Sequence, residues 1–283
     1  MDRDFDLIVI GGGSGGLAGA FRAAEHGARV ALLEPHLLGG TCVNVGCVPK
    51  KAMWLAADIA ARLRIAPTLG FAPMSAALDW PTFIVHRQRY IAGIHDSYRR
   101  RLDAAGIVSI ASRGRFVGPH VVQCDDGLRL GAPRILVATG GEPVRPPIAG
   151  ADLGAVSDDF FQWTAAPGRV AIVGGGYVAV ELAGVLQALG SRVEMFVRGP
   201  RLLDGFDAEL AELLAEDYRQ AGVHVHLECS AHGLVRDADG RMRLLDAAGG
   251  RGDAFDAVLF ATGRRANTAS LGLAAAGIAT DAR

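Results

Sequence analysis

The sequence predicts an α/β protein made of two similar domains, each with a parallel sheet, and three observations support this fold class. The chain has 283 residues, which is enough for two domains. Half of its residues are hydrophobic, 38 are glycines and only 21% are charged, a composition typical of a compact α/β enzyme. A pattern of strand, glycine turn, helix and strand occurs twice, and each copy precedes an apolar strand that ends in Ala-Thr-Gly.

The first copy predicts a strand over residues 6–10, a helix over residues 14–26 and a second strand over residues 28–34. The turn has the spacing G-x-G-x-x-G, formed by Gly11, Gly13 and Gly16. Glu34 lies about 20 residues downstream, where the fingerprint of a Rossmann-like dinucleotide-binding domain requires an acid. The glycines would let a pyrophosphate approach the helix N-terminus, and Glu34 could accept the hydroxyls of an adenosine ribose. The alternative is a glycine-rich turn without a ligand.

The second copy predicts another domain of the same kind. At the three glycine positions it has Gly174, Gly176 and Ala179. Alignment of the copies places Val197 where Glu34 stands in the first, and Arg198 follows directly. A carboxylate there would repel a 2′-phosphate, whereas a guanidinium can pair with one. We therefore interpret the second domain as an NADP site and the first as a site for an unphosphorylated adenosine. For Arg198 the alternative is a surface arginine at a strand end.

A Gly/Pro-rich stretch at residues 143–150 is a natural crossing point between the two domains. We therefore expect a first domain over residues 1–146, a second over residues 147–268 and a short return segment over residues 269–283. The segments that lead to the two Ala-Thr-Gly strands are predicted to be hairpins or short connections.

Charge and cysteine content indicate which partners the protein binds and in which compartment it lies. Lysines and arginines number 29 against 30 acids, so no net positive field attracts nucleic acid. No apolar stretch approaches the roughly 18 residues of a membrane span, and the acidic start of the chain is unlike a secretory leader. Four cysteines are too few for a disulfide-stapled secreted scaffold. We expect a cytoplasmic protein that binds neither nucleic acid nor membranes.

Two of the cysteines, Cys42 and Cys47, lie in the segment "GGTCVNVGCVPKK" at residues 39–51. They could form a redox pair, hold a zinc ion or be two buried thiols. The glycines before them and the proline and lysines after them favour a redox pair, because amides at a helix end and a nearby lysine stabilise a thiolate. No second Cys/His pair at ligand spacing accompanies them, so we expect no metal site. Cys124 and Cys229 match no motif and are interpreted as buried or incidental thiols.

These motifs resemble the pyridine nucleotide-disulfide oxidoreductases, and within them the glutathione reductase branch. The matching segments, in order, are "GGGSGG", "GGTCVNVGCVPKK", "SDDFF", "GGGYVAVELAG", "VRGPRLLDGFD" and "ATGRRAN". They cover nearly the whole chain, and the "VPKK" ending together with the Gly-x-Gly-x-x-Ala form of the second turn is similar to glutathione reductase.

The resemblance implies an enzyme in which electrons pass from NADPH to FAD, then to a Cys42–Cys47 disulfide and finally to glutathione disulfide. It implies that Cys47 faces the flavin and that Cys42 attacks the substrate. Lys50 and Glu181 match a pair beside the flavin and complete the expected catalytic set. Tyr177 matches the ring that covers the nicotinamide pocket, and Arg264 matches a residue near the NADPH. For these last two, plain packing or a strand-end charge is the alternative.

The resemblance and the two fingerprints together give the residues expected to bind FAD or NADPH. They are Gly11, Gly13, Ser14, Gly15, Gly16, Glu34, Gly40, Thr41, Cys42, Lys50, Thr139, Gly140, Gly174, Gly176, Tyr177, Ala179, Glu181, Arg198, Arg201, Gly263 and Arg264. Two positions depart from the family pattern. Asp204 stands where relatives usually have a second arginine, so Arg201 is expected to take over the 2′-phosphate contact. Phe21 stands where some relatives have a residue that binds a glutathione carboxylate, with Arg22 adjacent.

The family pattern continues beyond residue 283 with the rest of the FAD domain and a dimer-forming domain that carries a His-Glu acid/base pair. None of the eight histidines here is followed by proline as in that motif. We expect an incomplete version of a reductase whose full-length relatives are homodimers, with partial FAD retention and little glutathione reductase activity. The alternatives are a short nucleotide-binding protein without disulfide turnover and a reductase of another low-molecular-weight disulfide.

Overall fold

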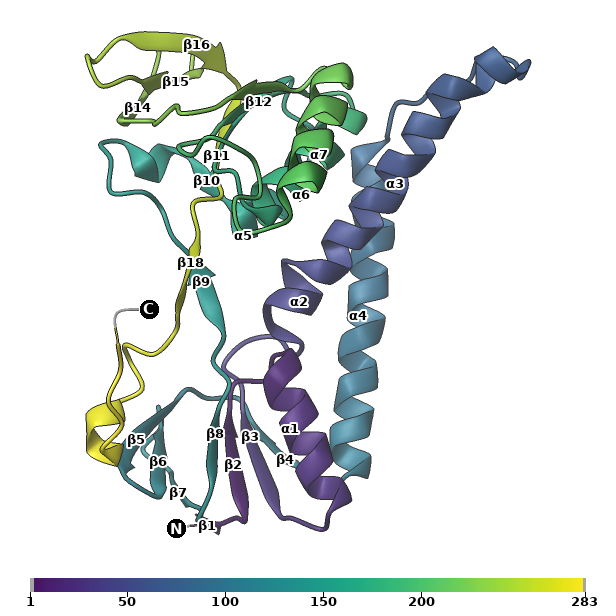
Figure 1. The fold of residues 1–283 in the computed structure, drawn as a ribbon. Helices are drawn as coiled ribbons and strands as arrows, with labels where there is room; N and C mark the ends of the chain where they lie inside the picture. The colour runs from purple at the N-terminus through teal and green to yellow at the C-terminus, as the bar shows by residue number, and fades with distance from the viewer. Residues whose placement is uncertain (1–2, 282–283) are drawn as a thin grey trace. The chain divides into compact units, whose positions relative to one another are not determined.

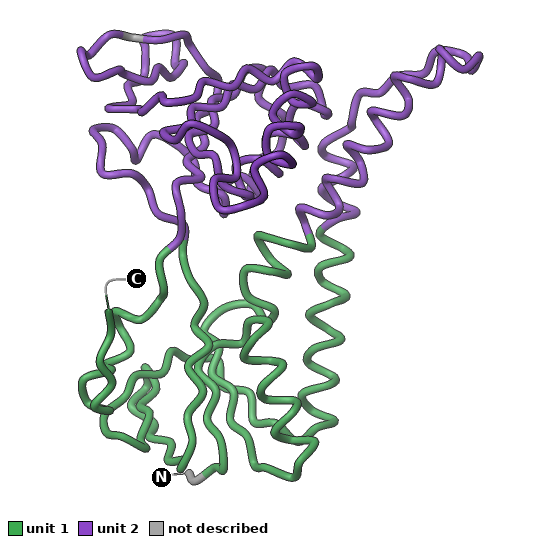
Figure 2. Tube along the Cα trace, viewed as in Figure 1, with its two compact units in different colours: residues 1–48, 88–142, 265–283 green, residues 49–87, 143–264 purple. Residues whose placement is uncertain are grey.

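The computed structural model describes residues 3–281 and divides into two compact units (Figure 2). Unit 1 comprises Met1–Val48, Gln88–Glu142 and Arg265–Arg283, and unit 2 comprises Pro49–Arg87 and Pro143–Arg264. Residues 1–2 and 282–283, at the ends of the expected first domain and return segment, lie outside the described residues. Where the chain leaves unit 1 and returns to it, β9 (Gly141–Pro143) and β18 (Arg264–Ala266) pair as a two-stranded sheet.

Unit 1 is built on a four-stranded parallel sheet in the order β4-β3-β2-β8. Its strands are β2 (Leu7–Ile10), β3 (Val30–Leu33), β4 (Val108–Ile110) and β8 (Ile135–Val137). The two central strands are apolar throughout, because both faces of this sheet are covered. Ile8 and Ile10 contribute to one core cluster and Val9 to another, as expected for side chains that alternate along a strand.

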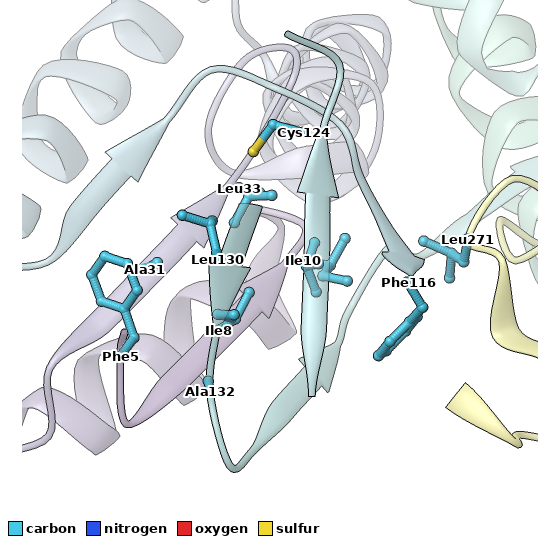
Figure 3. Packing of buried hydrophobic residues seen from close by; sticks show 11 residues of the cluster. Phe5, Ile8, Ile10, Ala31, Leu33, Phe116, Cys124, Leu130, Ala132 and Leu271 are labelled. Carbon is cyan, nitrogen blue, oxygen red and sulfur yellow. The ribbon is translucent and has the colours of Figure 1, made fainter. Parts of the chain in front are cut away.

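The first of these clusters lies between the parallel sheet and a second sheet in the order β1-β7-β6-β5 (Figure 3). The strands of the second sheet are β1 (Arg3–Asp4), β5 (Gly114–Gly118), β6 (Val121–Cys124) and β7 (Arg129–Gly131). Phe116, Cys124 and Leu130 from this sheet are buried in the same cluster as Ile8 and Ile10. Leu271, just before the 3-10 helix η3 (Leu273–Ala276), closes the cluster.

Helices cover the other face of the parallel sheet in unit 1 (Figure 1). Leu17 and Ala20 of α1 (Ser14–Glu25) and Leu102 of α4 (Trp80–Ala104) pack there against Val9 and Leu32. Between α1 and α4 the chain forms α2 (Gly40–Asn44), α3 (Cys47–Ile65) and the 3-10 helix η1 (Ala66–Leu69).

Unit 2 repeats this plan around a five-stranded parallel sheet in the order β10-β17-β11-β12-β13. Its strands are β10 (Ala155–Val156), β11 (Arg169–Val173), β12 (Arg192–Phe196), β13 (His224–His226) and β17 (Ala257–Phe260). Besides most of α3 and all of η1, its helical elements are the 3-10 helix η2 (Ala151–Leu153), α5 (Ser157–Phe160), α6 (Tyr177–Ala188) and α7 (Ala208–Gln220). Helix α7 begins at Asp207, whose Oδ1 accepts the backbone N–H of Leu210 at 3.1 Å as an N-cap.

A three-stranded antiparallel sheet completes unit 2, as the second sheet does in unit 1. Its strands, in the order β14-β15-β16, are β14 (Gly233–Arg236), β15 (Met242–Leu245) and β16 (Arg251–Phe255). Leu234, Leu244 and Phe255 from this sheet pack against Ala171 and Val258 of the parallel sheet. The expected α/β class is confirmed, and hairpins precede both exit strands, β8 and β17, as predicted.

Candidate functional site

The first glycine turn, in unit 1, leaves no room for larger residues. Gly11 has a φ of +109°, and a Cβ built on it would lie 2.3 Å from the carbonyl oxygen of Ala138. Its N–H donates to Leu33 at 2.8 Å, which ties the turn to β3. A Cβ on Gly16 would lie 1.8 Å from the carbonyl oxygen of Gly11. The turn and the first turn of α1 are therefore in backbone contact, as a strand–helix connection that binds a pyrophosphate requires.

Glu34 reaches back over this turn from the end of β3. Its Oε2 accepts the backbone N–H of Gly12 at 2.8 Å, and its Oε1 accepts the backbone N–H of His36 at 2.8 Å. The carboxylate is half-buried. Because each carboxylate oxygen has a second lone pair, Glu34 can still accept a ligand hydroxyl in this position.

The cysteine segment is attached directly to the first glycine turn. Gly39 donates its N–H to the carbonyl oxygen of Gly12 at 2.8 Å and forms a parallel bridge with Gly13. A Cβ on Gly40 would lie 2.8 Å from the Cα of Gly13. Helix α2 therefore starts beside the turn and carries the half-buried Cys42 in its first turn.

A buried histidine holds the cysteine segment from the other side. The Nδ2 of Asn44 donates to the carbonyl oxygens of Gly40 at 2.9 Å and Leu38 at 3.2 Å. Its Oδ1 therefore acts as the acceptor for the Nε2 of His95 in α4, at 2.8 Å. Burial, followed by the nearby Arg99, lowers the pKa of His95. A neutral imidazole thus fixes the segment between the two cysteines.

Cys47 is the first residue of α3 and is exposed. Lys50 follows one helical turn later, and its Nζ lies 2.5 Å from the Oε1 of Glu181 in α6. The lysine side chain is 28% exposed and the glutamate side chain 40% exposed. The ion pair joins α3 to α6 within unit 2 and leaves both groups accessible to a ligand.

The second glycine turn, in unit 2, matches the first in its backbone contacts. Gly174 has a φ of +138°, donates to the carbonyl oxygen of Phe196 at 2.9 Å, and would place a Cβ 2.4 Å from the carbonyl oxygen of Ala261. The two turns differ at the residue after the second strand and at the third glycine position. Val197 packs against the turn where unit 1 has Glu34, because a Cβ on Gly175 would lie 2.6 Å from its Cγ1. Ala179, at the third glycine position, is fully buried.

Both helices that follow the turns have open N-termini. Neither Gly13, the N-cap of α1, nor Gly176, the N-cap of α6, receives a side-chain cap from the residues that the structure describes. A Cβ on Gly15 or Gly176 would meet no described atom within 4 Å. Ser14 is exposed, as is Tyr177 at 57%. The first N–H groups of α1 and α6 are therefore available to a phosphate.

The loop after β12 carries the two arginines expected to bind a 2′-phosphate. Arg198 is exposed, and no carboxylate within residues 3–281 pairs with it. Arg201 behaves differently, because its Nε lies 3.0 Å from the Oδ1 of Asp204 and its Nη2 donates to the Asp204 carbonyl at 2.8 Å.

The two Ala-Thr-Gly segments lie beside the glycine turns and are hydrogen-bonded to the residues that directly follow β18 and β9. In unit 1 the carbonyl oxygens of Thr139 and Gly140 accept hydrogen bonds from Asn267. In unit 2 the carbonyl oxygen of Gly263 accepts the N–H of Val144 at 2.9 Å. Arg264 pairs with Asp158 of α5, with Nη1 and Oδ1 3.2 Å apart.

An open hollow of about 490 Å³ lies along α4 in unit 1. Tyr90, Tyr98, Arg89 and Arg101 line it, together with Ile94. The guanidinium of Arg101 also lies over the ring of Phe21 in α1, 4.4 Å from the ring centroid. A cation therefore lies against Phe21 of the helix that follows the first glycine turn.

Comparison with known proteins identifies the family. The sequence pattern of the pyridine nucleotide-disulphide oxidoreductases matches residues 5–283. The chain belongs to this family. Among its relatives are the glutathione reductases of Schizosaccharomyces pombe, 41% identical over 99% of this chain and 62% of that protein, and of Burkholderia cepacia, 39% identical over 98% and 61%. The HOCl-induced flavoprotein disulfide reductase RclA from Escherichia coli has a similar structure, with a TM-score of 0.86, 27% identity and coverage of 98% and 61%. The chain thus spans about 62% of the length of these relatives.

The oxidoreductase fold brings several of the expected site residues together. Glu34, Gly40 and the first glycine turn are in contact, and Lys50 contacts Glu181. Arg201 and Arg264 instead contact carboxylates, so their positions do not by themselves support a ligand contact. Asn44, His95 and Arg101 were missed by the sequence analysis. Asn44 could have been found from its place between the two cysteines. His95 and Arg101 can be found only when α4 is placed beside α1 and α2.

In the described part of the chain, no helix is long and apolar enough to cross a membrane. Within the same residues, no three His, Cys, Asp or Glu side chains gather in a way that could hold a metal ion.

Proposed function

We propose that the protein is a flavin-dependent glutathione-disulfide reductase that uses NADPH. The observation that carries this proposal is the 38–41% identity to three glutathione reductases over 98–99% of the chain. We also propose, from the cysteine content and the relatives, a cytoplasmic protein that acts as a homodimer when its sequence is as long as theirs.

The first glycine turn fits the adenosine and pyrophosphate of FAD. Gly11, Gly13 and Gly16 keep side chains away from the turn, and the uncapped start of α1 offers N–H groups to the phosphates. Glu34 is positioned for the ribose hydroxyls and would repel a 2′-phosphate. Bound FAD would supply a two-electron carrier between the nicotinamide and the cysteine pair.

The second glycine turn fits NADPH, because Val197 removes the acid and Arg198 supplies an exposed guanidinium. Lys50 is proposed to place a cation beside the reactive end of the flavin. Glu181 would balance that charge while the flavin is oxidised. Tyr177, exposed at the start of α6, is proposed to cover the nicotinamide pocket until the nucleotide arrives. Arg264 would have to leave Asp158 before it could bind a phosphate.

The two cysteines would carry out the disulfide exchange. The thiolate of Cys42 attacks one sulfur of glutathione disulfide, so that a mixed disulfide forms and one glutathione thiolate leaves. The thiolate of Cys47 then attacks the sulfur of Cys42 and releases the second glutathione. The product is a Cys42–Cys47 disulfide, which NADPH and one proton convert back to two thiols, leaving NADP⁺. Cys47 lies at the start of α3, where helix N–H groups favour a negative charge on sulfur.

The hollow along α4 suits a substrate with carboxylates. Arg101 lies over the ring of Phe21 and makes no ion pair with an acid among residues 3–281, so its N–H donors can face a carboxylate. Tyr90 and Tyr98 add hydroxyl groups to the same wall. Since His95 of the same helix, α4, contacts Asn44 in the cysteine segment, we propose that this wall binds the glutathione part of the substrate.

Counting thiols tests the proposal. After anaerobic addition of FAD and NADPH to the oxidised protein, we expect about two additional reactive thiols per chain. Cys42→Ser and Cys47→Ser should each abolish this increase, whereas the matched control Cys229→Ser should keep it. Glutathione disulfide should then consume the new thiols. If NADPH produces no thiols in the native protein, the proposal is wrong. Consumption by cystine but not by glutathione disulfide would establish the other low-molecular-weight substrate.

A further inference from the structure

The loop of residues 197–204 is fixed over the second glycine turn of unit 2. Leu203 donates its backbone N–H to the carbonyl oxygen of Gly175 at 2.7 Å. Glu228, in the segment after β13, donates its backbone N–H to the carbonyl oxygen of Gly199 at 3.0 Å. With hydrogen bonds near both ends, the loop presents its charged side chains from a defined backbone.

Within this loop, one of the two arginines forms an ion pair with a neighbouring aspartate. Arg201 makes two contacts with Asp204, one to the carboxylate at 3.0 Å and one to the backbone carbonyl at 2.8 Å. The arginine side chain is 34% exposed and the aspartate side chain 73% exposed. Arg198 is exposed and has no such partner in the part of the chain that the structure describes. The loop therefore offers one unpaired guanidinium and one exposed carboxylate.

We propose that Asp204 determines the choice between phosphorylated and unphosphorylated dinucleotides by holding Arg201 away from the 2′ position, an inference that rests on the proposed NADPH site. A 2′-phosphate must compete with Asp204 for the guanidinium of Arg201, and it also meets a like charge in the same loop. An unphosphorylated ribose meets neither penalty. The second site is thus one that accepts NADH alongside NADPH.

Asp204 also supplies a carboxylate near the second glycine turn, which has no counterpart of Glu34. In unit 1 the carboxylate of Glu34 lies directly over the glycine turn, but Val197 replaces it in unit 2. Asp204 lies seven residues farther along, next to the residue that is bonded to Gly175. A carboxylate there can accept a ribose hydroxyl, which is the contact that favours NAD over NADP in such folds.

Binding of two nucleotide probes, measured by calorimetry on the whole chain with excess FAD to occupy the first glycine turn, tests this inference without turnover. The probes are 2′,5′-ADP and 5′-AMP, which differ only in the 2′-phosphate. Asp204→Asn should tighten the binding of 2′,5′-ADP by about three- to tenfold, because the competing charge is removed while the side chain keeps its size. The affinity for 5′-AMP should fall by less than about threefold.

Two further variants separate the mechanism from a general charge effect. Asp239→Asn removes the carboxylate of another exposed arginine pair in unit 2, Asp239–Arg241, and should leave both affinities unchanged. In an Arg201→Gln background, Asp204→Asn should change 2′,5′-ADP binding by less than about threefold, since Asp204 no longer has a guanidinium to hold. The same gain in that background would overturn the role of Arg201.

The outcomes also separate this inference from the proposed function. If 2′,5′-ADP binds the native protein and Asp204→Asn does not tighten it, the inference is wrong and the NADPH site stands. If neither probe binds the native protein or the variant, the second turn is not a nucleotide site, and both proposals fail.

Discussion

The two glycine turns use one backbone contact to hold two different segments. In unit 1 the carbonyl oxygen of Gly12 accepts the N–H of Gly39 at 2.8 Å, and in unit 2 that of Gly175 accepts the N–H of Leu203 at 2.7 Å. Both donor residues have a positive φ, +93° for Gly39 and +50° for Leu203. After Gly39 the chain enters the cysteine helix, whereas Leu203 belongs to the loop with the arginines. The turn is a common support, and the segment that crosses it makes the units chemically different.

The largest expected difference between the turns concerns the third glycine position. Gly16→Ala would place a Cβ 1.8 Å from the carbonyl oxygen of Gly11, so we expect it to lower the free energy of unfolding by more than about 3 kcal/mol. Ala179→Gly, the reverse change in unit 2, should cost only about 1 kcal/mol, because it adds flexibility to a helix without a clash. Urea unfolding followed by circular dichroism measures both. Equal losses would mean that the two turns have the same geometry.

The donor residues give the next largest contrast. Gly39→Leu combines a left-handed backbone with a Cβ 2.5 Å from the Cβ of Val43, so we expect a loss of more than about 2 kcal/mol. Leu203→Gly relieves backbone strain in unit 2 but removes a half-buried side chain. The net change should lie within about 1 kcal/mol of zero. Thermal unfolding of the two variants tests this, and a large loss in Leu203→Gly would contradict it.

Glu34 and Val197 provide a smaller contrast at the end of the second strand of each unit. Glu34→Ala removes the acceptor for two backbone N–H groups, and we expect it to cost about 1–2 kcal/mol. Val197→Ala is the control: it removes buried methyl groups but no hydrogen-bond acceptor, so its cost should come from packing alone, about 1 kcal/mol. In unit 1 the change should also speed amide hydrogen exchange at Gly12, and exchange at Gly175 should stay unchanged in the Glu34 variant. Unaltered exchange at Gly12 would show that its hydrogen bond contributes little.

The last expected effect depends on pH and concerns the cysteine segment of unit 1. The pKa of His95 is lowered by burial in the folded protein, so the unfolded chain takes up a proton first as the pH falls below about 6.5. The stability of unit 1 should therefore decrease on acidification from pH 7 to pH 5, by at most about 1.4 kcal/mol per pH unit. His95→Gln should remove this slope, as measured by urea unfolding across the pH range. A slope that is equally steep in the variant would assign it to other groups.

Much of the fold was predictable because its signals are local. The strands, the helix after Gly11 and both glycine patterns follow from periodicity and spacing within about 30 residues. The contact between Asn44 and His95 was not predictable, because it joins residues 51 positions apart whose alignment depends on how α4 packs. Arg201 and Asp204 are only three residues apart, and their pairing could have been inferred from that spacing. The resemblance to the family predicts a phosphate contact for Arg201, whereas the structure pairs it with Asp204.

The burial of Cys124 between the two sheets of unit 1 limits which sulfur atoms can exchange (Figure 3). The thiol is 4% exposed, and burial raises its pKa, so it stays protonated and is a poor nucleophile. The proposed reaction passes through mixed disulfides, so a substrate must not be trapped on another sulfur. Here burial in the hydrophobic core keeps the Cys124 thiol away from disulfide exchange.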